Sequence, residues 1–153
     1  MSEIFIGLMS GTSADAIDAV AVDFSAANGF ALVATHSHPL SKNLRERISD
    51  ISSGASDRLD DIKRLEVDLS IEFSRCAQEI INALNEQPVA IGCHGQTVRH
   101  RPELGFTVQL ADGATIAQNT RTATVVDFRS ADIALGGQGA PLAPAFHREF
   151  FSS

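Results

Sequence analysis

Two stretches of this chain carry polar side chains that are suited to binding a ligand or to catalysis. The first, residues 10–18, reads SGTSADAID, with hydroxyls around Gly11 and then Asp15 and Asp18. Gly11 can take a positive φ that lets backbone approach a ligand, and hydroxyls beside successive N–H groups form a concavity that suits phosphate oxygens. Gly and Ser are also frequent in plain turns, so a turn without a ligand is the alternative.

The second group of polar residues stands where apolar runs end. Gln96 follows the apolar run 89–93, and Asp127 and Arg129 close the run 122–128. Ligands of open α/β sheets bind at the carboxyl ends of strands, so these side chains are expected to line a site.

A glycine-rich stretch, LGGQGAP at residues 135–141, comes next. It matches neither the dinucleotide fingerprint GxGxxG nor a Walker loop with its Gly-Lys-Ser/Thr. Those two nucleotide-binding folds are therefore disfavoured.

Composition excludes other classes of function. The 153 residues are 44% hydrophobic and 20% charged, as in one ordinary domain. A net charge of −7 argues against nucleic-acid partners, which need clustered Lys and Arg. No apolar run approaches the roughly 18 residues of a membrane span and no signal peptide is visible, so we expect no membrane partner and a cytoplasmic protein. Cys76 and Cys93 lie in apolar runs and are expected to be buried, reduced thiols.

The elements that position these residues follow from periodicity. Apolar runs 4–9 and 17–24 flank the first stretch as a hairpin, and residues 30–36 add a third antiparallel strand that Pro39 ends. Strands 89–93, 106–110 and 122–128, with a helix 114–120 capped by Asp112, are expected in the second half.

Two helices are expected between these parts. Ser41 is the predicted N-cap of the first, which Gly54 ends, and Ser56 is predicted to open the second. The second helix carries an apolar stripe that can cover one face of a sheet. The stripe consists of Leu59, Ile62, Leu65, Leu69, Phe73, Cys76, Ile80 and Leu84.

The C-terminal residues 144–151, PAFHREFF, predict an amphipathic helix with three phenylalanines that need packing partners. The helix could fold back onto its own sheet. Alternatively its apolar face is an interface, which predicts a homo-oligomer or an exchange of elements between copies through Phe146 and Phe151.

Several motifs in order resemble one family. GLMSGTSADAID, CHGQTVRH and ADGATIAQNTRTATVVDFRSADIALGGQGAPLAP with its following FH look like the N-terminal portion of the anhydro-N-acetylmuramic acid kinases. The resemblance implies the fold of the actin-like, hexokinase and heat-shock-protein-70 superfamily. In this fold an RNase-H-like α/β lobe has a mixed five-stranded sheet, three antiparallel plus parallel strands, flanked by helices. Residues 1–153 would be the N-terminal lobe of a two-lobed sugar kinase, with the C-terminal lobe absent.

The resemblance also implies an activity and a site. ATP, with Mg²⁺, would phosphorylate 1,6-anhydro-N-acetylmuramic acid at O6 while water opens the anhydro ring, in the peptidoglycan recycling of a bacterial cytoplasm. Gln96, Asp127 and Arg129 would lie on the sugar side, where the Arg129 guanidinium could bind the lactyl carboxylate; an ion pair with Asp127 or Asp132 is the structural alternative. The ATP-phosphate loop would be Gly11, Thr12, Ser13, Ala14, Asp15, Ala16, Ile17 and Asp18.

Two departures from the family pattern matter. The family has glycine after the loop aspartate, SxDGxD, where this chain has Ala16, so a positive φ there would strain the loop. The family's general base belongs to a downstream Asp-Thr-Gly-Pro-Gly-Asn segment that these residues do not contain, so the chain is expected to be inactive alone. A binding module that holds phosphate, nucleotide or sugar without catalysis is the alternative, and an actin-like assembly protein is a third.

Overall fold

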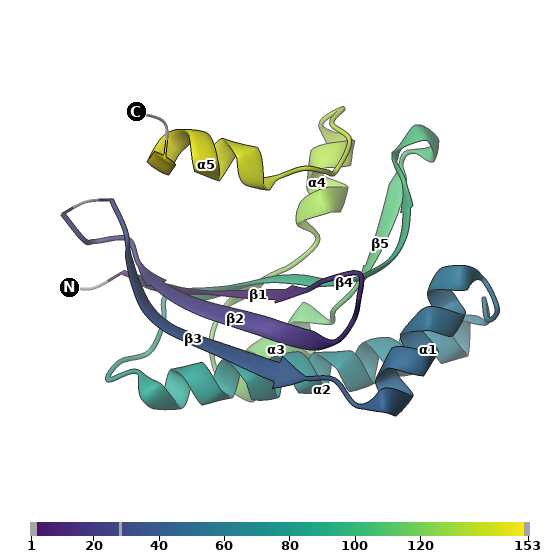
Figure 1. The fold of residues 1–153 in the computed structure, drawn as a ribbon, viewed down its shortest axis with the longest axis horizontal. Coiled ribbons are helices and arrows are strands. Elements are labelled where there is room, and N and C mark those ends of the chain that lie inside the picture. The colour runs from purple at the N-terminus through teal and green to yellow at the C-terminus, as the bar shows by residue number, and fades with distance from the viewer. Residues whose placement is uncertain (1–2, 28, 152–153) are drawn as a thin grey trace.

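The computed structural model describes residues 3–27 and 29–151, which form one mixed sheet with helices on both sides (Figure 1). Within these residues the six strands are β1 (Ile4–Ser10), β2 (Ala16–Asp23), β3 (Ala31–Pro39), β4 (Ala90–Arg101), β5 (Phe106–Leu110) and β6 (Thr124–Val125). The order β3-β2-β1-β4-β5 places the predicted antiparallel unit beside β4, which runs parallel to β1. The mixed α/β class is confirmed. The sheet has one strand more than the five that the resemblance implies, because the predicted strand 122–128 survives as the short β6, which pairs with β4.

Helices cover the two faces of this sheet unequally. In the described part of the chain they are α1 (Lys42–Ser53), α2 (Leu59–Ala83), α3 (Gly113–Thr120), α4 (Phe128–Ala134) and α5 (Ala143–Phe151), with a 3-10 turn η1 (Pro102–Leu104). Figure 1 shows α1, α2 and α3 on one side of the sheet, which we call the core face. The side that carries α4 and α5 is the open face.

The core face is closed by the apolar stripe of α2. Leu65, Leu69, Phe73 and Cys76 are all 0% exposed, as the helical spacing predicts. Leu59 was expected on the same stripe but is 71% exposed, because it opens the helix before the stripe reaches the sheet. The stripe therefore forms the core, with its first position left in solvent.

The two cysteines are buried and free, as predicted. Burial raises the pKa of the Cys76 thiol and of the Cys93 thiol to about 12 each. The Cys76 Sγ–H donates a hydrogen bond to the Ile17 carbonyl at 3.5 Å, which ties α2 to β2. These thiols act as small core side chains.

Helix ends follow the predicted caps in three of four cases. The Ser41 hydroxyl accepts from the Leu44 N–H, Gly54 ends α1 at φ 82, and Asp112 accepts from the Ala114 N–H at the start of α3. The fourth expectation, Ser56 as the cap of α2, is wrong. That helix begins after Arg58 without a side-chain cap, and the Ser56 hydroxyl donates to Asp61 instead.

The second half of the chain departs most from the predicted elements. The strand expected to end at residue 93 continues as β4 to Arg101, so Gln96 lies inside a strand. The expected strand 122–128 is reduced to β6, because Asp127 adopts φ 62 and Phe128 begins α4. The open face thus gains a helix where an extended strand was expected.

The C-terminal helix α5 lies over the open face, at the end of the sheet near the turn that follows β2 (Figure 1). Its Phe150 ring lies 5.1 Å from the Phe30 ring and 6.2 Å from the Phe24 ring, between ring centroids. The packing is incomplete, since Phe146 remains 39% exposed and Phe151 65% exposed. The predicted amphipathic helix is confirmed, and it folds back onto its own chain without burying its apolar face.

Candidate functional site

The hairpin tip, residues 11–18, joins β1 to β2 through a tight turn. The Ala14 N–H donates to the Gly11 carbonyl at 3.1 Å, which closes the turn. Gly11 was expected to supply the positive φ, but Ala14 does so instead, with φ 54 and a buried methyl group. A left-handed alanine is uncommon, and it persists here because surrounding contacts hold it.

Ala16 sits in regular structure. It is the first residue of β2, opposite Pro39 in the register with β3, and its φ is not positive. Its carbonyl accepts a hydrogen bond from the Ser10 hydroxyl at 3.3 Å. The condition for strain at this position, a positive φ, is therefore not met in this backbone.

The exposed rim of the tip consists of Thr12 and Ser13. Both are exposed, and within residues 3–27 and 29–151 nothing accepts a hydrogen bond from either backbone N–H. Two adjacent N–H groups that point away from the protein's own acceptors can bind an anion. By contrast, Ala14 and Ile17 turn their side chains into the core, where Ile17 is 0% exposed.

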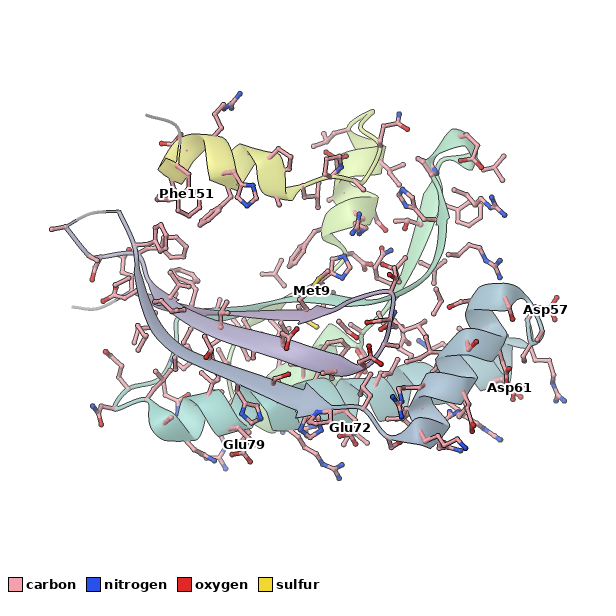
Figure 2. The ribbon with its side chains drawn as sticks, viewed as in Figure 1. Met9, Asp57, Asp61, Glu72, Glu79 and Phe151 are labelled. Atoms are coloured by element: carbon pink, nitrogen blue, oxygen red, sulfur yellow. The ribbon has the colours of Figure 1, made fainter. Side chains whose placement is uncertain are left out.

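Two carboxylates flank this rim. Asp15 lies 3.5 Å from the Arg45 guanidinium in an exposed ion pair, and Asp18 accepts a hydrogen bond from the Ser37 hydroxyl at 2.7 Å. Met9 pairs with Asp18 in the β1–β2 register, and Figure 2 shows Met9 on the open side of the sheet. Asp18 therefore stands on the open face, beside the tip.

Gln96 contacts the tip directly. It is 1% exposed, its Oε1 accepts from the Ser10 hydroxyl at 2.7 Å, and its Nε2 donates to the Gly11 carbonyl at 3.3 Å. The same Nε2 donates to the Thr97 carbonyl at 3.2 Å. Gln96 was expected to follow a strand, but it lies inside β4, with its side chain beneath the tip.

A bulge in β4 aligns Gln96 with Ser10. The parallel register pairs Leu8 with Cys93 but Ser10 with Gln96, so β4 holds one extra residue over this interval. Gly95 makes it with φ 74, where an added Cβ would lie 3.0 Å from the Leu110 carbonyl oxygen. Only glycine fits this backbone without strain.

Arg129, at the start of α4, is held by two hydrogen bonds. Its Nε donates to His94 Nε2 at 2.8 Å and its Nη1 donates to the Gly139 carbonyl at 2.7 Å. Among the described residues neither Asp127 nor Asp132 pairs with it, so the ion-pair alternative is wrong. Asp132 instead accepts from the Gly139 N–H at 2.7 Å. The two side chains together brace the glycine-rich loop.

His94 is a site residue that sequence reasoning missed. Arg129 can only donate, so His94 Nε2 must accept, and the ring proton therefore lies on Nδ1, which contacts the Gly95 carbonyl at 2.8 Å. Burial first, and then the charge of Arg129, lower the pKa of His94, which keeps the ring neutral. The signal available was a histidine directly before the glycine of the CHGQ segment.

The structure therefore brings the predicted residues to one end of the sheet through β4. Gln96 touches the tip, and His94, two positions earlier in the same strand, touches Arg129. Asp127 stands at the N-terminus of α4 with no capping bond from its side chain. No group of three His, Cys, Asp or Glu side chains in the described residues is arranged to hold a metal unaided. Every helix in residues 3–27 and 29–151 is too short or too polar to span a bilayer.

A three-stranded antiparallel unit extended by a parallel strand, with helices on both faces and a hydroxyl-rich hairpin tip, is the lobe of an actin-like ATPase fold. Comparison with known families then narrows this class. The family model described as anhydro-N-acetylmuramic acid kinase matches residues 3–153. The chain belongs to the anhydro-N-acetylmuramic acid kinase family.

Curated relatives carry the same description. This chain is 46% identical over 155 residues to the anhydro-N-acetylmuramic acid kinase of Shewanella denitrificans, and 46% identical over 160 residues to that of Saccharophagus degradans. It is 42% identical over 153 residues to that of Neisseria gonorrhoeae. In each case 98% of this chain is covered, and the chain spans 42% of the length of the relative.

Proposed function

We propose that this chain is the part of an anhydro-N-acetylmuramic acid kinase that holds the phosphates of ATP and one side of the sugar. The reaction would transfer the γ-phosphoryl group to O6 of 1,6-anhydro-N-acetylmuramic acid while water opens the anhydro ring, giving N-acetylmuramic acid 6-phosphate. The observation that carries the proposal is the pair of exposed, unpartnered N–H groups at Thr12 and Ser13, in a chain whose family is a kinase family.

The tip fits phosphate on physical grounds. Kinases stabilise a transition state whose charge lies on phosphoryl oxygens, so preorganised donors are the main requirement. The Thr12 and Ser13 N–H groups are free to donate, and the turn that presents them is closed by the bond from Ala14 to Gly11. Side-chain hydroxyls at the same positions add two rotatable donors.

Mg²⁺ would be held beside this tip. Mg²⁺ commonly takes one or two carboxylates and completes its shell with phosphate oxygens and water. Asp18 lies on the open face, and one of its carboxylate oxygens accepts a hydrogen bond from Ser37. Asp15 forms only a solvent-exposed ion pair with Arg45. These two carboxylates fit such a role, and the ion would neutralise charge on the phosphoryl group.

Arg129 and Asp127 would form the sugar side. Arg129 has five N–H donors, and Nε and one Nη1 hydrogen are engaged in the described structure, so donors remain for a carboxylate. The lactyl carboxylate of muramic acid is the group that such a fork binds. The general base and the adenosine pocket would belong to a second lobe, with residues 1–153 as the N-terminal lobe of a bacterial cytoplasmic enzyme.

A chimera tests the proposed function. This chain, joined to the unmatched remainder of the Shewanella denitrificans relative, is expected to transfer label from ATP to the anhydro sugar, and the chain alone is expected not to. Asp18→Asn in the chimera should lower the rate strongly, whereas Asp57→Asn, an exposed carboxylate near the start of α2 (Figure 2), should leave it unchanged. Turnover by the isolated chain, or a chimera insensitive to Asp18→Asn, would contradict the proposal.

A further inference from the structure

The Gln96 amide has no free edge for a ligand. The side chain is 1% exposed, its Oε1 is taken by the Ser10 hydroxyl, and its two Nε2 hydrogens are taken by the Gly11 and Thr97 carbonyls. An amide carries two donor hydrogens, so the donor capacity of Gln96 is complete. A sugar hydroxyl could accept from this amide only by displacing one of the chain's own carbonyls, and the remaining lone pair of Oε1 is closed to it by burial.

The backbone is shaped to bring this amide under the tip. Without the bulge at Gly95, the residue opposite Ser10 would be Gly95 itself, which has no side chain. Because side chains alternate along a strand, the extra residue also returns Gln96 to the core face that Cys93 occupies. A left-handed glycine in mid-strand weakens a sheet, so its presence requires a compensating contact.

Gln96 donates to the Gly11 carbonyl oxygen, the same atom that closes the turn of the tip. The Gly11 carbonyl accepts both the Ala14 N–H at 3.1 Å and the Gln96 Nε2 at 3.3 Å. Thr12 and Ser13 lie between Gly11 and Ala14, and their N–H groups have no acceptor in the described residues. Fixing the Gly11 carbonyl therefore fixes the peptide planes that present those donors.

We infer that Gln96 is a positioning residue for the phosphate-binding tip, and that it acts through the Gly11 carbonyl without contacting the sugar. The inference rests on the proposed function of the tip. It reassigns Gln96 from the sugar side to the nucleotide side of the site.

The chain offers a matched control in β5. Gln109 is a second buried glutamine, 8% exposed, whose Nε2 donates to the Thr97 and Thr107 hydroxyls. Its Oε1 is buried and lacks a partner in the described residues. Gln109→Leu therefore removes a comparable side chain from the neighbouring strand without touching the tip.

Amide hydrogen exchange in the ligand-free chain measures the positioning directly. Gln96→Leu should speed exchange of the Ala14 N–H about thirtyfold, because two hydrogen bonds of roughly 1 kcal/mol each no longer hold the turn, and it should shift the Thr12 and Ser13 amide resonances. Gln109→Leu should leave all three unchanged. An unaltered Ala14 exchange rate in Gln96→Leu, or an equal change in Gln109→Leu, overturns the inference.

Gln96→Glu adds a readout that a merely structural side chain would not move. Its ionised carboxylate has no hydrogen to offer Gly11, whereas the protonated acid has one. Acidification should therefore restore slow Ala14 exchange in Gln96→Glu and not in Gln96→Leu, and identical pH behaviour of the two variants would contradict the inference. Should Gln96→Leu fail to fold, Ser10→Ala takes its place; it removes the hydroxyl that orients Gln96 but keeps the bond to Gly11, so it should speed Ala14 exchange only about fivefold.

Titration with MgATP separates this inference from the proposed function. If the tip binds phosphate, wild-type and Gln109→Leu chains should bind MgATP alike and Gln96→Leu about thirtyfold more weakly, the full effect of two lost hydrogen bonds. A wild-type chain that ignores MgATP while Gln96→Leu still loosens the tip would refute the phosphate role and leave the positioning intact. Loss of anhydro-sugar binding in the chimera with an unchanged tip would return Gln96 to the sugar.

Discussion

The two faces of the sheet differ in how completely their apolar side chains are buried. On the core face, Ile17, Phe73 and Ile91 are 0% exposed and pack into one continuous cluster with α2. On the open face, Val20 is 39% exposed and Val125 is 53% exposed. An apolar cavity of about 420 Å³ lies there, lined by residues of β1, β2 and β4 together with Phe24 and Phe146 and Val125.

This difference separates the face that supplies stability from the region where we expect binding. Packing to native density holds the strands in register, and that register presents the tip and Gln96 at one end of the sheet. The open face carries α4, with its polar contacts, and α5, with its incompletely packed phenylalanine rings. All residues of these two helices are partly or fully exposed. We therefore expect mutations on the core face to cost stability and mutations near the tip to cost binding.

Core truncation gives the largest expected effect. Phe73→Ala should lower the free energy of unfolding by about 3–5 kcal/mol, because a large ring at 0% exposure leaves a cavity. Phe146→Ala on the open face, where the ring is already 39% exposed, should cost about 1 kcal/mol or less. Chemical denaturation of both variants measures the contrast, and equal losses would remove the distinction between the faces.

High pH probes the same core through its thiols. Each thiol has its pKa raised from 9.0 to about 12, so its contribution is fully present below pH 9 and is lost as pH rises toward 12. At pH 10 ionisation of each thiol should reduce stability by about 1 kcal/mol. The double variant Cys76→Ala with Cys93→Ala should show a shallower loss between about pH 9 and 11, whereas a slope equal to wild type would contradict burial of the thiols.

Substitution of two left-handed glycines separates backbone strain from crowding. Gly54→Ala at φ 82 meets nothing within 4 Å and should cost about 1 kcal/mol. Gly95→Ala at φ 74 also places its Cβ 3.0 Å from the Leu110 carbonyl oxygen, so it should cost about 2–3 kcal/mol and weaken MgATP binding. Thermal unfolding ranks the two variants. Equal costs, or normal MgATP binding in Gly95→Ala, would show that the bulge does not serve the tip.

The smallest expected effect concerns association through α5. We propose that the exposed part of the Phe146 to Phe151 surface drives weak self-association or exchange of elements, because apolar surface left open favours contact with another copy. Sedimentation at rising concentration should show an increasing mass that Phe151→Ser reduces. A strictly monomeric wild-type chain would mean that packing on Phe24 and Phe30 satisfies this helix.

Local rules predicted much of the fold. The Ser41 and Gly54 caps of α1 and the stripe of α2 depend on residues within a turn or two of each other, so spacing was sufficient. The hairpin from β1 to β2 followed from alternation around small residues. These elements carry most of the core.

What the sequence did not predict depends on partners distant in the chain. Gly95 read as the end of a strand, because nothing local shows that Leu110 and Ser10 hold both sides of a bulge. The left-handed Asp127, which lies between β6 and α4 at the N-cap of the helix, was missed for the same reason. The family motif suggested a positive φ at Ala16, whereas the structure has the positive φ at Ala14. Residue types suggested the candidate site residues, whereas their hydrogen-bond partners depend on the three-dimensional fold.

The most direct test of the central claim is a titration of the isotope-labelled chain with MgATP, followed through its backbone amide resonances. We expect saturable shifts centred on Thr12 and Ser13, with smaller shifts at Gly11 and Asp18 and none at the amides of α1. Saturable shifts that spare the hairpin tip and fall instead on the apolar cavity beneath Phe146, or no shifts at millimolar nucleotide, would contradict it.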